Sequence, residues 1–205
     1  MLREYMPLDT EFRAYYRTMP LRQARAEFAE FVSSLPERVA QLHRALGETG
    51  RGHIPLDYSF ESVARLGEWL DAQVQTKARD PDTVAAVRSR VPSYVRVDSW
   101  ELSAETITIC NHVGAYVGEC LVRQHDALVW DFVRAPKSDV YVHQPVVVGP
   151  PLPARKCGDP NGLRMNPIGV VLGIAMATVG GKRAVELLPT ALANNRAILL
   201  GLYKP

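Results

Sequence analysis

One helical segment, expected over residues 105–124, carries the side chains best suited to chemistry. Four polar residues recur on it at spacings of three and four, namely His112, Tyr116, Glu119 and Arg123. An α-helix turns once every 3.6 residues, so these side chains share one stripe and could bring a general base, a phenol and a charged pair to a cleft. We favour a plainer interpretation, a solvated or interface-facing stripe whose Glu119–Arg123 pair contributes only tenths of a kcal/mol.

Cysteine chemistry is a second candidate. Cys110 and His112 are two residues apart and so point about 200° from each other on a helix, which excludes a nucleophile–base dyad. Cys157 follows Arg155 and Lys156 in a loop, and these neighbouring positive charges would lower the pKa of its thiol. A lone loop cysteine is more often incidental, so Cys157 is a weak candidate.

We expect no metal and no cofactor. The histidines and cysteines do not follow the HxxH, HExxH or CxxC spacings of metal sites. The Gly180–Gly181–Lys182 run lacks the first glycine and the Ser/Thr of a phosphate-binding loop, and it follows a helix instead of a strand. We interpret it as the end of that helix.

Basic residues gather in the proline-rich loop 149–167, which has too many prolines and glycines for a regular element. Loops of this length are often functional. Arg155, Lys156 and Arg164 would suit a lid over an anionic substrate, with Arg123 and Trp130 as further binding residues.

The first half of the chain is expected to be mainly helical. A helix starts after Pro20, and Ser34 with Pro36 indicates a stop and a restart before Gly47 and Gly50 end the second helix. An amphipathic stripe predicts a helix over 59–74, with Ser59 as its N-cap, and Asp80 or Asp82 caps another short helix. Residues 93–100 alternate in polarity and form a short strand or an extended connector.

The second half combines a hairpin with helices. Ser103 caps the largely buried helix already described. Strands over 127–133 and 140–148 form an antiparallel hairpin, in which Pro145 marks an edge or bulged strand. Helices follow over 168–179 and 184–200. The fold class is therefore α+β, predominantly helical with a small antiparallel hairpin or sheet after a central buried helix.

Small residues predict close packing at two places. Gly114 and Gly118 lie four residues apart on the central helix, where each costs up to about 1 kcal/mol relative to alanine unless a neighbour approaches closely. Gly169, Gly173 and Ala177 repeat this spacing on the apolar helix 168–179. Close packing or a homodimer seam would explain the second stripe.

Composition bounds the function classes. The chain has 205 residues, a formal net charge of +2 and a hydrophobic fraction of 47%. We expect one domain with a helical extension over 1–54, a core over 55–148 and a final part over 149–205. An odd number of cysteines and no signal peptide or spanning helix favour the cytoplasm and exclude the membrane. Nucleic acid is disfavoured, since the basic C-terminal part has a single aromatic residue, Tyr203.

Residues 55–148 carry a recognisable pattern: LDYSFESVARLGEWLD, then NHVGAYVGECLVR, then the strands LVW and VYVHQPVVV. The pattern resembles poorly characterised small proteins of actinobacteria that have a G-x-Y-x-G helix and a tryptophan-bearing strand. Some of these are proposed toxin-immunity partners. The resemblance implies no catalytic residue, and His112 stands where it would place a carboxylate.

The sequence supports two alternative functions for this protein. The first is a protein-binding or immunity-type module without catalysis, which presents helix 105–124 and its hairpin to a protein partner. The alternative is a small-molecule enzyme or binding protein for an anionic ligand, with a pocket between helix 105–124 and loop 149–167, where His112, Tyr116 and Glu119 line the site.

Overall fold

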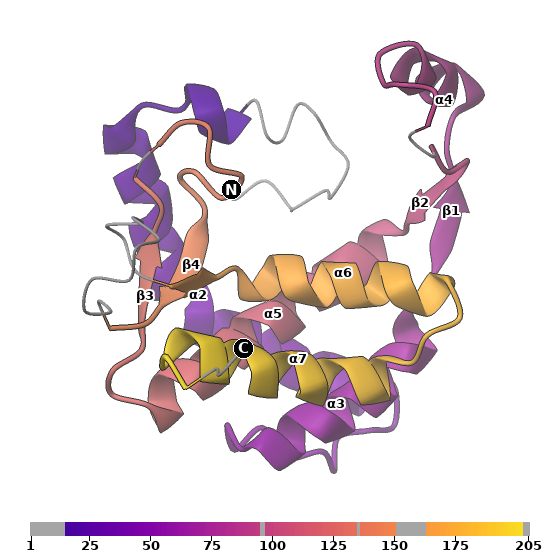
Figure 1. The fold of residues 1–205 in the computed structure, drawn as a ribbon. Helices are drawn as coiled ribbons and strands as arrows, with labels where there is room; N and C mark the ends of the chain where they lie inside the picture. Colours follow the sequence, from indigo (N-terminus) through magenta and orange to yellow (C-terminus); the bar gives the residue numbers. More distant parts are fainter. Residues whose placement is uncertain (1–14, 95–96, 135, 151–162, 203–205) are drawn as a thin grey trace.

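The structure is a computed structural model that describes residues 15–94, 97–134, 136–150 and 163–202. Figure 1 shows a body of packed helices, a small sheet on one side and an arm that projects from the other. The helices are α2 (Leu21–Glu48), α3 (Phe60–Gln73), α4 (Pro81–Arg88), α5 (Ala104–Gln124), α6 (Pro167–Val179) and α7 (Ala184–Leu199). The strands are β1 (Thr76–Ala78), β2 (Trp100–Leu102), β3 (Val129–Phe132), β4 (Pro145–Val148) and β5 (Arg164–Met165). The predicted class is confirmed: mostly helical α+β, with two small antiparallel sheets.

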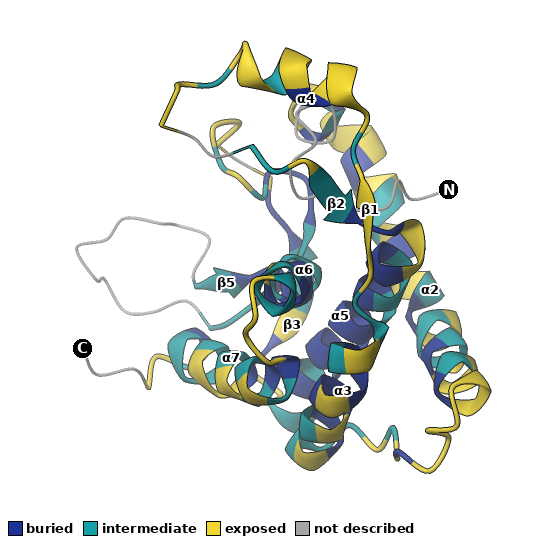
Figure 2. Ribbon diagram, turned by 90° about the vertical axis from the view of Figure 1, so that its right-hand side faces the viewer, coloured by how far each residue is buried: buried dark blue, intermediate teal, exposed yellow. Residues whose placement is uncertain are grey.

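Helix α5 is the centre of the body. Ser103 caps it as expected, accepting a hydrogen bond from the backbone N–H of Thr106 at 3.1 Å. Its neighbours are α2, α3, α6 and the β3–β4 pair, and Figure 2 shows it as a largely buried helix among them. The expected burial of this segment is confirmed.

Both glycines of α5 make room for a neighbour. A Cβ on Gly114 would lie 2.6 Å from the Cα of Ile168, where α6 crosses. A Cβ on Gly118 would lie 2.1 Å from the ring of Trp130 on β3. The predicted close approach is therefore confirmed, and a helix and a tryptophan side chain are the groups that approach.

Helix α2 corrects one expectation. It is continuous over 28 residues with Pro36 inside it, where a stop and restart were predicted. Ser34 caps no new helix; its hydroxyl donates back to the carbonyl of Phe31 at 2.7 Å. Proline removes only one helical hydrogen bond. The buried side chains of Phe31, Leu35 and Leu42 hold the helix on both sides of Pro36.

The three-stranded sheet shows that the expected position of strand 140–148 at a sheet edge is wrong. Its order is β3-β4-β5, so β4 is the middle strand although Pro145 predicted an edge or a bulge. Pro145 is the first residue of β4, opposite Phe132, a position that tolerates the missing N–H. The antiparallel pairing of the predicted hairpin is confirmed, with strands shorter than expected.

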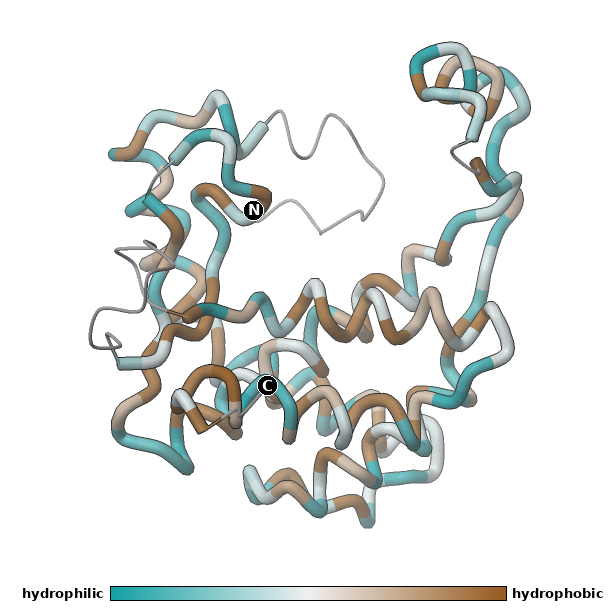
Figure 3. Tube along the Cα trace, in the orientation of Figure 1, coloured by the Kyte–Doolittle hydropathy of each residue, from teal (hydrophilic) through white to brown (hydrophobic). Residues whose placement is uncertain are grey.

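Helices α6 and α7 complete the body. Asn166 caps α6 through the N–H of Gly169 at 2.9 Å, and Gly181, at φ +89°, follows its end. Figure 3 shows α6 mainly in white and brown, in agreement with its apolar sequence. Of its small-residue stripe, Gly173 has no close neighbour among the described residues, since a Cβ there would meet nothing within 4 Å, whereas a Cβ on Gly169 would lie 3.3 Å from the side chain of Asn166. No helix of the described part of the chain could cross a membrane.

The arm comprises residues 76–102 and contains β1, α4 and β2. It leaves the body between α3 and α5 and carries α4 away from the other helices (Figures 1 and 2). Of the two predicted candidates, Asp80 and Asp82, Asp80 is the residue that caps α4, through the N–H of Thr83 at 2.8 Å. Residues 93–100 were predicted as a short strand or an extended connector, and strand β2 begins at their last residue, Trp100. Its partner β1 was not predicted.

Candidate functional site

Tyr116 is fully buried against α3. Its hydroxyl accepts the backbone N–H of Tyr58 at 2.8 Å and lies 2.6 Å from the hydroxyl of Ser62. Because Ser62 donates its own proton to the carbonyl of Ser59, Tyr116 donates to Ser62. Burial raises the pKa of Tyr116. The phenol is therefore engaged in packing and does not reach a cleft.

Tyr58 is held in a conformation that tyrosine rarely adopts. Its φ is +63°, in the left-handed region. Both of its backbone groups are held from α5, because Tyr116 accepts its N–H and the side-chain amide of Gln124 donates to its C=O. Its ring stacks on that of Tyr116 with centroids 5.3 Å apart. This residue was not among the predicted site residues, since a positive φ at tyrosine leaves no pattern in the sequence.

Glu119, Arg123 and Trp130 form a connected polar group. Glu119 accepts from the Nε of Arg123 at 3.0 Å and from the indole N–H of Trp130 at 2.9 Å. The guanidinium of Arg123 lies 4.0 Å above the ring of Tyr58. Three residues of the predicted stripe, Tyr116, Glu119 and Arg123, are thus linked through Tyr58. Trp130 also packs edge-on against Phe31, with centroids 5.0 Å apart.

His112 does not join this group. It is half-buried, and Arg38 and Glu37 of α2 are the charged groups that act on it. Burial first, and the charge of Arg38 second, lower the pKa of His112 to about 4. The imidazole is neutral at pH 7.

The cysteines of α5 are also buried. Desolvation raises the pKa of both the Cys110 and the Cys120 thiol to about 12, so neither is a thiolate at neutral pH. Cys157, Arg155 and Lys156 lie outside the described residues. Their predicted roles remain predictions.

Arg164 lies in a second polar cluster, beside the start of α6. Its guanidinium pairs with Asp139, and the two side chains are 14% and 10% exposed. Next to it, the side-chain amide of Asn166 donates to Gln144 at 2.8 Å. Buried His143, at φ +62°, contacts the carbonyl of Tyr16 through Nδ1 at 2.8 Å. The charge of Arg164 is thus matched inside the fold, and the cluster fixes the hairpin to α6 and to residue 16.

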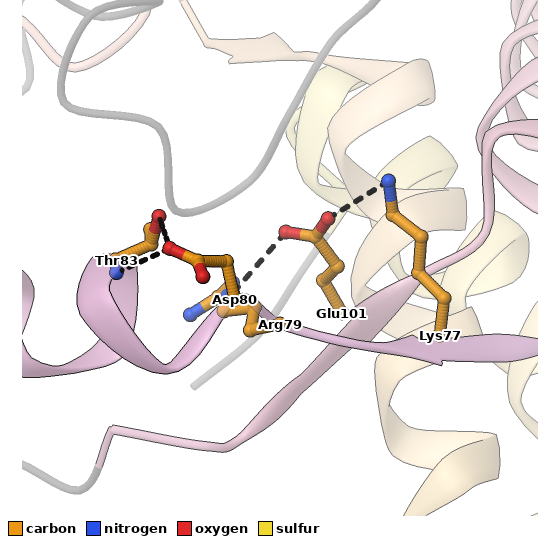
Figure 4. Close-up of polar contacts among 5 residues, drawn as sticks. All are labelled: Lys77, Arg79, Asp80, Thr83 and Glu101. Carbon is orange, nitrogen blue, oxygen red and sulfur yellow. Dashed lines mark hydrogen bonds and ion pairs between the residues drawn. The ribbon is translucent and has the colours of Figure 1, made fainter.

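Ion pairs join the two strands of the arm (Figure 4). Glu101 on β2 pairs with Lys77 at 3.0 Å and with Arg79 at 3.2 Å. Burial works to raise the pKa of Glu101, but the hydrogen bonds and charges of Lys77 and Arg79 outweigh it and hold this pKa below its usual range. Side chains therefore join the two short strands at their middle residues, Lys77 and Glu101, and just beyond β1 through Arg79.

The arm is exposed on most of its surface. Val84 is the one buried residue of α4, and Tyr94 is 86% exposed. Strand β1 is exposed at all three of its residues. Isolated two-stranded sheets and helices of two turns are marginal by themselves. The arm therefore depends on its junction with the body and on the Glu101 pairs.

The described part of the chain offers no assembled catalytic set. The phenol of Tyr116 and the thiols of Cys110 and Cys120 are enclosed, and among the described residues the charged groups that act on His112 are Arg38 and Glu37, not Glu119. No group of three or more metal-ligating side chains occurs among the described residues. Comparison with protein-family models, curated proteins and solved structures gives no match to this chain.

Proposed function

We propose that the chain is a protein-binding module without catalysis and that the arm, residues 76–102, is its contact surface. The observation that carries the proposal is the arm itself. It extends from the body, and it contributes little to the core. Its two strands are joined to each other by the Glu101 pairs.

The composition of the arm fits a protein contact. Tyr94 and Arg88 are exposed, and tyrosine and arginine are the residue types that dominate binding energy at protein interfaces. Half-buried Val87 and Val91 add apolar surface beside them. A partner that covers this surface would stabilise an element that is marginal when alone.

This proposal changes the surface that the sequence suggested. Helix 105–124 was expected to face the partner, but α5 is enclosed by other elements over most of its length. Its exposed residues lie at its two ends, Ala104 and Glu105 in the first turn and Arg123 in the last. The immunity-type role remains part of the proposal through the resemblance of residues 55–148, whose matching motifs lie before and after the arm.

The test is capture followed by reconstitution. The full chain is used to retain partners from extracts of its native organism and from co-expressed products of neighbouring genes. The purified partner is then titrated against the wild type, Arg88→Ser and Tyr94→Ser, with Arg44→Ser on α2 as the matched surface control.

We expect both arm variants to weaken the affinity at least about tenfold, as hot-spot truncations do, and Arg44→Ser to leave it unchanged. Equal affinity for all four proteins would contradict the role of the arm. Absence of any partner, together with turnover of a small molecule, would contradict the function class.

A further inference from the structure

Two arginines, one on α5 and one on α7, lie over aromatic rings near the end of α5 that is opposite the arm. Arg123 lies 4.0 Å above Tyr58, and Arg196 of α7 lies 5.1 Å above Phe60. Both rings belong to the segment that opens α3, two residues apart. The field of Arg196 also contributes to lowering the pKa of His125, after the larger effect of burial, which places Arg196 near the end of α5.

Arg123 is pre-organised to bind an anion. Glu119 holds its Nε and the Tyr58 ring supports its plane, so the guanidinium is fixed in two directions. Its side chain is 53% exposed, and among the described residues no partner contacts Nη1 or Nη2. A free Nη1–Nη2 edge matches the two oxygens of a carboxylate. Fixing the group beforehand reduces the entropy lost on binding.

Arg196 adds a second positive charge without an internal partner. It forms no ion pair with any residue that the structure describes, and it is half-buried. A half-buried guanidinium without a carboxylate is a costly arrangement that a partner's negative charge would relieve. The strained backbone of Tyr58 supports the same surface, since strain of this kind persists where function requires a fixed geometry.

We propose that Arg123 and Arg196, each supported by an aromatic ring, form a docking site for a carboxylate-rich segment of a protein. The site is separate from the arm, because α5 is about 30 Å long and lies between them. The inference therefore goes beyond the proposed function, and the binding role of either surface can be disproved without affecting that of the other.

The experiment uses the full chain and a labelled peptide of Glu-Gly repeats, with a Gln-Gly peptide of equal length as reference. Fluorescence anisotropy follows binding at fixed ionic strength. We expect selective binding of the glutamate peptide and a loss of about tenfold in affinity for Arg123→Gln and for Arg196→Gln. Arg123→Lys should lose nearly as much, because lysine keeps the charge but not the planar fork.

Arg65→Gln is the matched control. Arg65 forms an i,i+4 pair with Glu61 on α3 and does not lie above a ring of the described residues, so its loss should leave peptide binding unchanged. Asp126→Asn should tighten binding slightly, because it removes a negative charge beside His125. Thermal unfolding of each variant establishes that it is folded.

Three results would overturn the proposal. Equal weakening by Arg65→Gln would mean that only net charge matters. Displacement of the peptide by inorganic phosphate at the same ionic strength would assign the site to a free anion. Equal binding of a single-stranded oligonucleotide would assign it to nucleic acid.

Discussion

The hydroxyl of Tyr116 accepts the backbone N–H of Tyr58 at 2.8 Å and so joins the centre of α5 to the segment that opens α3. This contact explains why a phenol at the expected position of a catalytic group is fully enclosed. It also holds Tyr58 at φ +63°, where its ring can support Arg123. One buried side chain thereby determines the geometry of a surface.

Tyr116→Phe tests this relationship. The substitution leaves the N–H of Tyr58 without its partner and removes the phenol that donates to Ser62, whose hydroxyl keeps its bond to the carbonyl of Ser59. An unsatisfied buried group costs about 1–3 kcal/mol. We expect a loss of that size in the free energy of unfolding, measured in urea. Tyr94→Phe, at an exposed position, is the control and should change nothing. Equal stability of both variants would show that the Tyr116 hydrogen bonds contribute nothing.

The glycines of α5 and α6 should respond to alanine in opposite directions. Gly114→Ala would push a methyl group into the backbone of Ile168 and should destabilise the protein by about 1–3 kcal/mol. Gly173→Ala meets no atom within 4 Å and should stabilise it by up to about 1 kcal/mol through helix propensity. Thermal unfolding of the two variants shows whether each substitution stabilises or destabilises the protein. A stabilising Gly114→Ala would disprove the close crossing of α5 and α6.

His112 makes stability depend on pH. Burial and Arg38 lower its pKa from 6.5 to about 4, so the unfolded state binds more protons between these values. Stability should therefore fall as the pH drops below 6.5, and this loss should be complete near pH 4. Urea unfolding at pH 7 and pH 5 measures the effect. His112→Gln should lose less stability than the wild type over this interval, and an equal loss would assign the effect to other groups.

The buried thiols should be unreactive in the folded state. Cys110 and Cys120 are enclosed, and burial raises the pKa of each to about 12. In a Cys157→Ser variant we expect no reaction with a thiol reagent at pH 8 until urea unfolds the chain. Rapid labelling of the folded variant would show that α5 is accessible and that its enclosure is incomplete.

The sequence predicted the helices well because their apolar residues recur with helical spacing and their ends carry caps. Ser59, Asp80 and Ser103 all cap the helices assigned to them. The spacing of Gly114 and Gly118 also predicted a close approach, since glycine inside a helix is costly unless a neighbour needs the space.

Other features depend on tertiary contacts that leave little local pattern. Strand β1 is exposed on both faces and so lacks the alternation that marks a half-buried strand. Packing on both sides of Pro36 outweighed the local stop signal at that point in α2. At the candidate site, the spacing of residues on α5 correctly predicted the pair of Glu119 and Arg123. Tyr58, whose ring lies under Arg123, comes from another segment of the chain. Contacts of this kind, between residues far apart in the chain, follow only from the fold.

The most direct test of the central claim is amide hydrogen exchange of the full chain, alone and saturated with its purified partner. In the free protein we expect fast exchange in α4 and in β1, because few contacts hold the arm to the body. In the complex, exchange at residues 76–102 should slow more than in any other part of the chain. Unchanged exchange in the arm, with protection confined to the helical body, would contradict the account.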